Sequence, residues 1–212
     1  MGCECCAKVD TVFDQSRAED DLARYRSEGP DPMTAVLLDY LKERGVAGKT
    51  ILDIGGGVGM IGLELLQAGA ARATNVEASE AFVSVGKQAA VENEVSDRSM
   101  FKKGDFCEVA NTVESADIVT LDKMLCCYAD LESLVTTSVA KAQEVYALIY
   151  PRDVWWAKLG IFGANIVGLF LGHIWQTVHA TKEVDALIEA AGFRKTFEEY
   201  RGRWQIVVFE KS

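Results

Sequence analysis

The sequence predicts an α/β fold, a seven-stranded and mostly parallel sheet with helices on both faces and an antiparallel hairpin at the C-terminus. Three observations support this prediction. Short apolar segments alternate with amphipathic ones at intervals of roughly 20–30 residues, as in a parallel sheet whose crossovers are helical. A glycine-rich loop follows the first apolar segment. The last two apolar segments are separated by only three residues, 201–203.

Composition sets the first limits. The chain has 212 residues, of which 49% are hydrophobic and 25% charged, typical of one folded domain. Its net charge of −10 argues against sequence-independent nucleic-acid binding and against a polybasic contact with membranes. Residues 1–20 are polar or cysteinyl and contain no signal-peptide core, so we expect a cytoplasmic protein with reduced thiols.

Residues 1–44 are predicted to form an N-terminal helical cap. A mixed-charge helix is expected over 14–28, and Gly29-Pro30 ends it. A second helix is expected to begin at Asp31-Pro32, where the carboxylate caps the first turn and the proline lacks an N–H that would have no partner there. Gly45 is expected to end this helix.

Residues 45–212 are predicted to form one further domain. Its sheet and helices follow each other in regular order. Parallel strands are expected at 51–54, 73–77, 100–103, 116–121 and 144–150. Helices are expected at 60–68, 80–93 and 130–142, and Thr181 is expected to cap a last helix that Gly192 ends. Strands 194–200 and 204–210 must be antiparallel, because a parallel crossover needs about a dozen residues or more.

The loop at residues 53–59 indicates a nucleotide site. Glycines allow the backbone to approach a ligand closely, and the helix that follows offers free N–H groups. Glu77 lies 22 residues after Gly55, at the end of the next strand, where a carboxylate can accept both hydroxyls of an adenosine ribose. The spacing Gly57-x-Gly59-x-x-Gly62 also fits an NAD fingerprint, which leaves an NAD-dependent reductase as an alternative. Against it, no tyrosine has a lysine four residues later, as single-domain reductases require.

The same segments resemble the class I S-adenosylmethionine-dependent methyltransferases. Residues 52–59 resemble their motif I, Glu77 matches their ribose-binding acid, and Asp105 matches the acid that contacts the adenine amine. Residues 117–122 resemble their fourth strand, which borders the reacting methyl group. The resemblance implies a Rossmann-like fold, S-adenosylmethionine as cofactor and no catalytic metal. The cofactor-binding residues it implies are Asp53, Gly55, Gly57, Glu77, Ala78, Asp105, Phe106 and Leu121.

A narrower resemblance covers residues 121–130. This segment is similar to the Leu-Asp-x-x-x-Cys-Cys-Tyr-x-Asp segment of the magnesium-protoporphyrin O-methyltransferases and their uncharacterised relatives, with Ala129 where that group has proline. Residues 150–153 and 178–179 also resemble the group. Because ligand crevices lie at the carboxyl ends of parallel strands, the acceptor side is expected to hold three candidate catalytic residues. These are Asp122, Tyr128 and His179.

Residues 159–181 contain no Asp, Glu, Lys or Arg. The segment belongs to a helical insertion expected at about 152–178, with a row of small residues four apart at Gly160, Ala164, Gly168 and Gly172. Polar residues dilute its second half, so we do not expect it to span a membrane. A substrate-covering helix, a dimer seam, a membrane-surface contact and plain core packing remain open alternatives.

The function predicted from these features is methyl transfer from S-adenosylmethionine to a small or medium, apolar acceptor, by O- or S-methylation. A small-molecule substrate is expected, with no nucleic-acid partner, at most an incidental membrane contact, and a monomer or homodimer. The alternative is a cofactor-binding sensor without turnover, whose metal site would be the N-terminal thiols of Cys3, Cys5 and Cys6.

Overall fold

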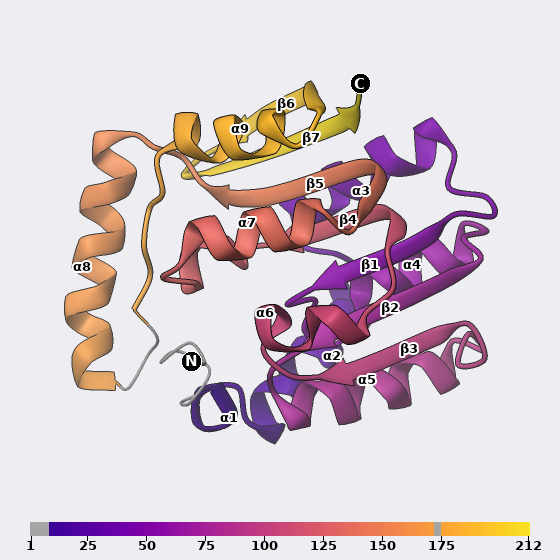
Figure 1. The fold of residues 1–212 in the computed structure, drawn as a ribbon. Coiled ribbons are helices and arrows are strands. Elements are labelled where there is room, and N and C mark those ends of the chain that lie inside the picture. The colour runs from indigo at the N-terminus through magenta and orange to yellow at the C-terminus, as the bar shows by residue number, and fades with distance from the viewer. Residues whose placement is uncertain (1–8, 172–174) are drawn as a thin grey trace.

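The computed structural model describes residues 9–171 and 175–212 (Figure 1). Seven strands form one sheet in the order β3-β2-β1-β4-β5-β7-β6. β1 to β5 are mutually parallel, whereas β7 runs antiparallel to both β5 and β6. The predicted fold class, including the C-terminal hairpin, is confirmed. The strands are β1 (Thr50–Ile54), β2 (Arg72–Glu77), β3 (Ser99–Lys103), β4 (Ala116–Asp122), β5 (Ala142–Pro151), β6 (Phe193–Arg201) and β7 (Trp204–Lys211).

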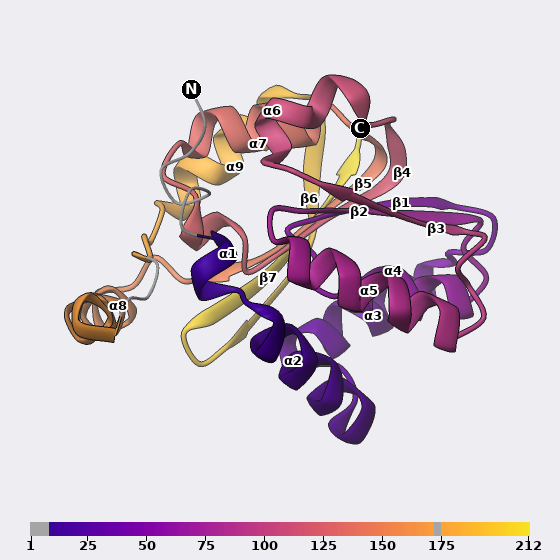
Figure 2. The same ribbon diagram turned by 90° about the horizontal axis from the view of Figure 1, so that it is seen from below.

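Helices cover both faces of this sheet, with α3, α4 and α5 on one face and α6, α7 and α9 on the other (Figure 2). Two buried apolar clusters correspond to these two faces. The helices are α1 (Val9–Val12), α2 (Gln15–Glu28), α3 (Pro32–Arg44), α4 (Met60–Gln67), α5 (Glu80–Glu92), α6 (Phe106–Val109), α7 (Leu131–Val139), α8 (Trp155–Leu171) and α9 (Thr181–Ala190). Short 3-10 turns lie at Ala110–Thr112 and Leu125–Cys127.

Side-chain caps fix where several helices begin. Asp14 accepts the backbone N–H of Arg17, and Asp31 accepts that of Met33, so α2 and α3 begin where the sequence predicts. The predicted cap at Thr181 is wrong. The N-cap is Ala180, without a side-chain hydrogen bond, and the Thr181 hydroxyl instead accepts a hydrogen bond from Gln205 of β7. α7 ends three residues earlier than predicted, because β5 begins at Ala142 to pair with β4.

The strand order places the carboxyl ends of β2, β1 and β4 side by side. From β1 the chain adds β2 and β3 on one side of the sheet and then crosses back to add β4 on the other side of β1. The point between β1 and β4 is therefore a topological switch point. Open α/β sheets bind ligands at such a switch point. Asp53, Glu77 and Asp122 end or nearly end these three strands and therefore meet at one edge.

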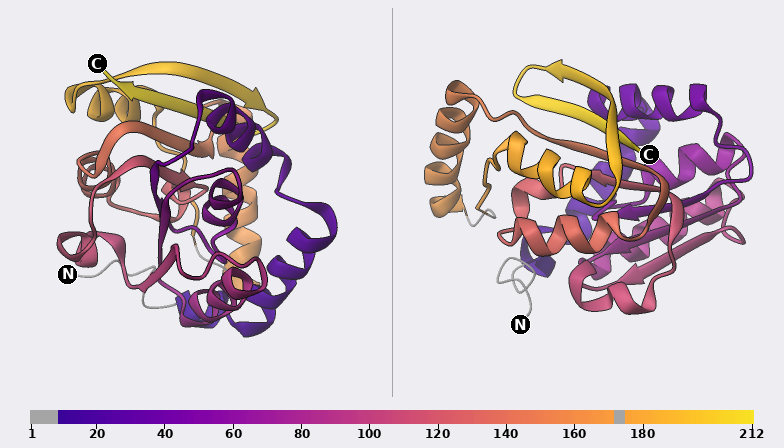
Figure 3. Two further views of the ribbon diagram at one scale, coloured as in Figure 1. Left: turned by 90° about the vertical axis from the view of Figure 1, so that its right-hand side faces the viewer. Right: turned by 45° about the horizontal axis from the view of Figure 1, so that its top comes forward.

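Helix α8 stands apart from the two layers in the right-hand view of Figure 3. Among the side chains of residues 155–168, it buries one row, Ala157, Ile161 and Asn165, and leaves most of the bulky apolar ones exposed. Among the residues that the structure describes, no helix is long and apolar enough to cross a membrane.

Candidate functional site

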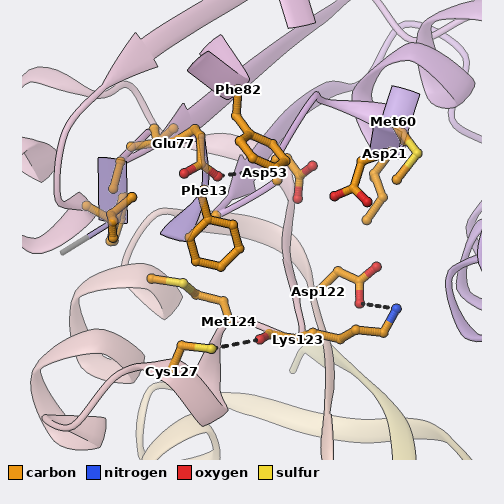
Figure 4. Close-up of a pocket in the computed structure, with 18 of the residues that line it drawn as sticks. Phe13, Asp21, Asp53, Met60, Glu77, Phe82, Asp122, Lys123, Met124 and Cys127 are labelled. Atoms are coloured by element: carbon orange, nitrogen blue, oxygen red, sulfur yellow. Dashed lines mark hydrogen bonds and ion pairs between the residues drawn. The ribbon is translucent and has the colours of Figure 1, made fainter. Parts of the chain in front are cut away.

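A cavity of about 380 Å³ opens at the carboxyl ends of β1, β2 and β4. This volume lies within the range of about 300–1,000 Å³ found for small-ligand pockets. Figure 4 shows carboxylates, aromatic rings and sulfur atoms converging on it from several elements. Eight of the residues predicted from the sequence line it: Asp53, Gly55, Gly57, Glu77, Ala78, Asp105, Phe106 and Asp122.

The glycine loop forms one wall of the cavity. Gly55 and Gly57 have φ of 67° and 58°, a conformation that side-chain-bearing residues rarely adopt. At Gly56 an added Cβ would lie 2.1 Å from Oδ2 of Asp53. The loop can therefore turn this tightly, and leave its backbone open to a ligand, only because these positions carry no side chain.

Asp53 is the most deeply buried acid at this edge. The β1–β4 register sets it beside Thr120, whose hydroxyl donates to Oδ1 of Asp53 at 2.7 Å. Its other oxygen, Oδ2, is buried without a hydrogen-bond partner. Burial raises the pKa of Asp53 to about 7, and the negative charges of Asp122 and Glu77 act in the same direction. An unpaired carboxylate oxygen in such a place favours a cationic ligand.

Glu77 is held by the backbone of the loops on either side. Its Oε2 accepts the N–H of Gly57 at 3.0 Å, and its Oε1 accepts the N–H of Ser79 at 2.9 Å. Burial raises its pKa, although these backbone hydrogen bonds oppose the shift. Each carboxylate oxygen has lone pairs beyond the one that these bonds use, so both can still accept from ligand hydroxyls.

Asp122 faces Asp53 across the cavity. Its Oδ2 accepts the hydroxyl of Thr34 from α3, whereas its buried Oδ1 has no hydrogen-bond partner and lies 3.7 Å from Nζ of Lys123. Burial raises the pKa of Asp122, and the ammonium of Lys123 opposes the shift. Lys123 itself has a φ of 57°, a strained conformation of the kind that occurs at functional sites.

The Tyr128 side chain contacts Asp105, one of the residues that line the cavity. Its hydroxyl donates to Oδ1 of Asp105 at 2.9 Å, and the backbone N–H of Cys107 donates to the same carboxylate. Tyr128 does not line the cavity, and neither does Leu121, which is fully buried in β4. The structure thus places the tyrosine behind Asp105, where it fixes the orientation of that carboxylate.

His179 also lies outside the lining. Its Nε2 is 3.0 Å from the carbonyl oxygen of Leu125 and 3.1 Å from that of Tyr128, so the ring N–H can donate to this loop. The backbone N–H of Thr177 donates to the carbonyl of Cys126 at 2.7 Å. Residues 177–179 therefore hold the loop after β4 in place.

The cavity also contains residues that the sequence alone did not indicate. From the N-terminal segment come Phe13 and Arg17, and the Phe13 ring meets the edge of Phe82 at 5.7 Å between centroids. Thr34, Lys123 and Trp204 line it as well. No motif links these positions, because they come from segments that only folding brings together. Lys123 and Met124 could have been found from their place directly after the fourth strand.

Within the described ranges 9–171 and 175–212, no group of three or more His, Cys, Asp or Glu side chains is arranged to hold a metal ion. The predicted thiol site of the sensor alternative, Cys3, Cys5 and Cys6, lies outside these ranges.

Comparisons with known proteins agree with this geometry. Residues 21–121 match a family model described as "Methyltransferase small domain". A ribosomal protein L11 methyltransferase of Shewanella amazonensis is 36% identical over 70 residues, 33% of this chain and 24% of that protein. The corresponding protein of Alteromonas mediterranea is 29% identical over 134 residues, 59% of this chain and 46% of that protein. The chain thus spans between a quarter and about half of the length of these relatives.

Solved structures show the fold over the whole chain. The magnesium protoporphyrin IX methyltransferase of Synechocystis with bound S-adenosylhomocysteine has a TM-score of 0.75 at 18% identity, covering 99% of this chain and 100% of that one. A putative RNA methyltransferase of Pyrococcus horikoshii has a TM-score of 0.59 at 18% identity, covering 84% of this chain and 83% of that one. The predicted resemblance to class I methyltransferases is confirmed.

The prediction about partners is wrong. We expected a small-molecule substrate and no nucleic-acid partner, but the curated relatives are named for a ribosomal protein and one structural neighbour is a putative RNA methyltransferase. The net charge of −10 opposes contacts to many backbone phosphates, but it sets no limit on a macromolecule that presents a single group to a pocket. Apolar residues near the site likewise do not limit the size of the acceptor molecule.

Proposed function

We propose that the chain carries a class I, S-adenosylmethionine-dependent methyltransferase domain and that it transfers the methyl group of this cofactor to a side chain of a protein acceptor. The cofactor part of the proposal rests on two buried carboxylate oxygens. Asp53 Oδ2 and Asp122 Oδ1 are buried at one cavity without hydrogen-bond partners. A buried carboxylate is costly unless it is paired, so the site fits a ligand with positive charge. S-adenosylmethionine carries an ammonium and a sulfonium.

Each end of the cavity suits one part of this ligand. We assign the amino-acid part to Asp53 and the open backbone of Gly55 and Gly57. Glu77, with its free lone pairs, would accept from the ribose hydroxyls, beside the backbone of Ala78. Asp105 and the buried Phe106 ring would receive the adenine, and Leu121 would support this floor from within the sheet.

The proposed chemistry requires little of the protein. The sulfonium supplies an electrophilic methyl group when the cofactor is bound. The residues directly after β4, Asp122 to Met124, would hold the acceptor in line with it and exclude water, which is how positioning lowers such a barrier. Asp122, with its raised pKa, is placed to receive a proton from an acceptor that is not yet ionised. We assign positioning roles to Tyr128, through Asp105, and to His179, through the carbonyls of the loop.

Two observations support a protein acceptor. The curated relatives are named for methylation of ribosomal protein L11. The chain's net charge of −10 also complements basic proteins, since opposite charges steer association. An oxygen or sulfur atom as the methyl acceptor remains a prediction.

The test is transfer of radiolabel from S-[methyl-³H]adenosylmethionine to a cell extract, divided into a low-molecular-weight filtrate and a macromolecular fraction. We expect label in macromolecules that proteinase removes and ribonuclease does not. Label confined to the filtrate or lost with ribonuclease would overturn the protein acceptor. Glu77→Gln serves as the inactive control, and Glu80→Gln, which removes an exposed carboxylate at the start of α5, is its matched active control.

A further inference from the structure

The loop after β4 carries two adjacent thiols that the proposed methyl transfer does not use. Cys126 and Cys127 form the end of the 3-10 turn Leu125–Cys127, and both line the cavity. Their sulfur atoms are 3.7 Å apart. Both cysteines are free, and this distance is far longer than the roughly 2.05 Å of a disulfide. Figure 4 shows the Cys127 sulfur beside Met124 on the cavity wall.

The pair is held in this arrangement by the surrounding backbone. The N–H of Cys127 donates to the carbonyl of Met124 at 3.0 Å, which closes the turn. The thiol of Cys126 donates to the carbonyl of Lys123 at 3.2 Å. Thr177 and His179 fix the same loop from outside, as described above. Two sulfur atoms on one side of a braced turn are preorganised for a ligand that needs both.

The two thiols differ in reactivity. When Cys127 is ionised, the Cys126 S–H can turn from the carbonyl of Lys123 to the Cys127 sulfur. This interaction lowers the pKa of Cys127, and the positive charge of Arg17 acts in the same direction. The same interaction, together with burial, raises the pKa of Cys126. Cys127 is therefore the thiol that ionises first and attacks, since the thiolate is the nucleophile.

We propose that Cys126 and Cys127 form a dithiol site for trivalent arsenicals and related thiophilic metalloids. Thiolates are the ligands that such soft centres prefer, and the thioether of Met124 adds a third sulfur to the same wall. With an organoarsenic(III) oxide, two S–H bonds break and two S–As bonds form. The oxide oxygen leaves as water with both protons, and the arsenic remains trivalent. The site requires neither bound S-adenosylmethionine nor turnover.

Phenylarsine oxide is the probe that tests this site. The experiment uses the full chain with Cys3, Cys5 and Cys6 replaced by serine, so that the N-terminal thiols cannot compete. Intact-mass spectrometry should show one phenylarsenic adduct with loss of one water. The adduct should persist in excess 2-mercaptoethanol and be removed by 2,3-dimercaptopropanol, because only a dithiol competes with a chelate. Absence of the adduct would overturn the proposal.

Single substitutions in that background separate a chelate from a single-thiol reaction. Cys127→Ser and Cys126→Ser should each weaken binding at least about 100-fold, since the second bond forms within the molecule. Cys107→Ser is the matched control, because Cys107 is partly exposed but lies outside the cavity lining, and it should bind like the parent. Circular dichroism checks folding; if the buried Cys126 position does not tolerate serine, Cys127→Ser decides alone. Binding by Cys127→Ser as tight as the parent's would overturn the dithiol site.

Discussion

Strand β5 and helix α8 follow each other in the chain and are both rich in apolar residues, yet β5 is buried and α8 is largely exposed. Every residue of β5 from Val145 to Pro151 is buried, between β4 and β7 and beneath helices on both faces. In α8, Trp155 is 75% exposed and Leu159 62%. Apolar composition alone therefore does not determine whether a segment is buried. The number of elements that pack against the segment determines how much of its apolar surface is buried.

The largest expected effect tests this contrast with one substitution made in both regions. Leu148→Ala in β5 should lower the free energy of unfolding by about 2–5 kcal/mol, because a fully buried side chain leaves a cavity. Leu159→Ala in α8 should change it by no more than about 0.5 kcal/mol. Urea unfolding followed by circular dichroism measures both. Equal losses at the two positions would mean that α8 packs as a core element.

A second contrast lies along the strands, between their apolar middles and their polar carboxyl ends. Glu77→Gln should weaken S-adenosylhomocysteine binding by about 1.5–3 kcal/mol, the usual contribution of a hydrogen bond to a charged group. Isothermal titration calorimetry gives this value, with the exposed Glu80→Gln as control. Unchanged affinity in Glu77→Gln would remove Glu77 from the proposed ribose contact.

The pH dependence of ligand binding tests the polar carboxyl ends of the strands in a second way, and its expected effect is smaller than that of Glu77→Gln. The pKa of Asp53 is about 7 in the folded chain and near 3.8 when unfolded, so the folded state binds the extra proton between these values. Stability of the free protein should therefore fall as pH rises from about 4 to about 7. The ammonium group of S-adenosylhomocysteine, placed at Asp53, favours the ionised carboxylate, so the affinity for this ligand should rise about tenfold between pH 6 and pH 8.

Asp53→Asn supplies the control for this pH dependence. It keeps the size of the side chain and should bind the ligand more weakly but with a flatter pH profile, as measured by calorimetry at the two pH values. A profile equally steep in Asp53→Asn would assign the titration to another group, and Glu77, whose pKa burial also raises, would be the first to examine.

The smallest expected effect concerns the attachment of α8. The side chain of Asn165 donates to the carbonyl of Gln176 at 2.7 Å and accepts its N–H at 2.9 Å. Asn165→Ala should lower the free energy of local opening in this region by about 0.5–1.5 kcal/mol. Hydrogen exchange should quicken in residues 155–168, while the urea midpoint and the exposed control Asn111→Ala stay unchanged. Global destabilisation would contradict a local attachment.

Much of the site could be predicted from the sequence because its signals are local. A glycine run between a strand and a helix, and an acid at the end of the next strand, place Gly55, Gly57 and Glu77 without knowledge of the tertiary structure. Tyr128 and His179 show where such reasoning ends. The sequence places them after the fourth strand and before the last helix, but it does not determine where their side chains point. Tyr128 is directed to Asp105, and His179 to the carbonyls of Leu125 and Tyr128.

The sequence by itself determined the mostly parallel α/β fold class, the antiparallel hairpin and the acids at the strand ends, because periodicity and turn length act over a few residues. Only the tertiary structure decided that Asp53 and Asp122 would each keep one oxygen without a hydrogen bond at the same cavity, and that Phe13 and Thr34 would close its sides. It also decided that α8 would expose its apolar face. Burial and hydrogen-bond pairing depend on neighbours that are distant in the chain, and a local sequence pattern does not identify these neighbours.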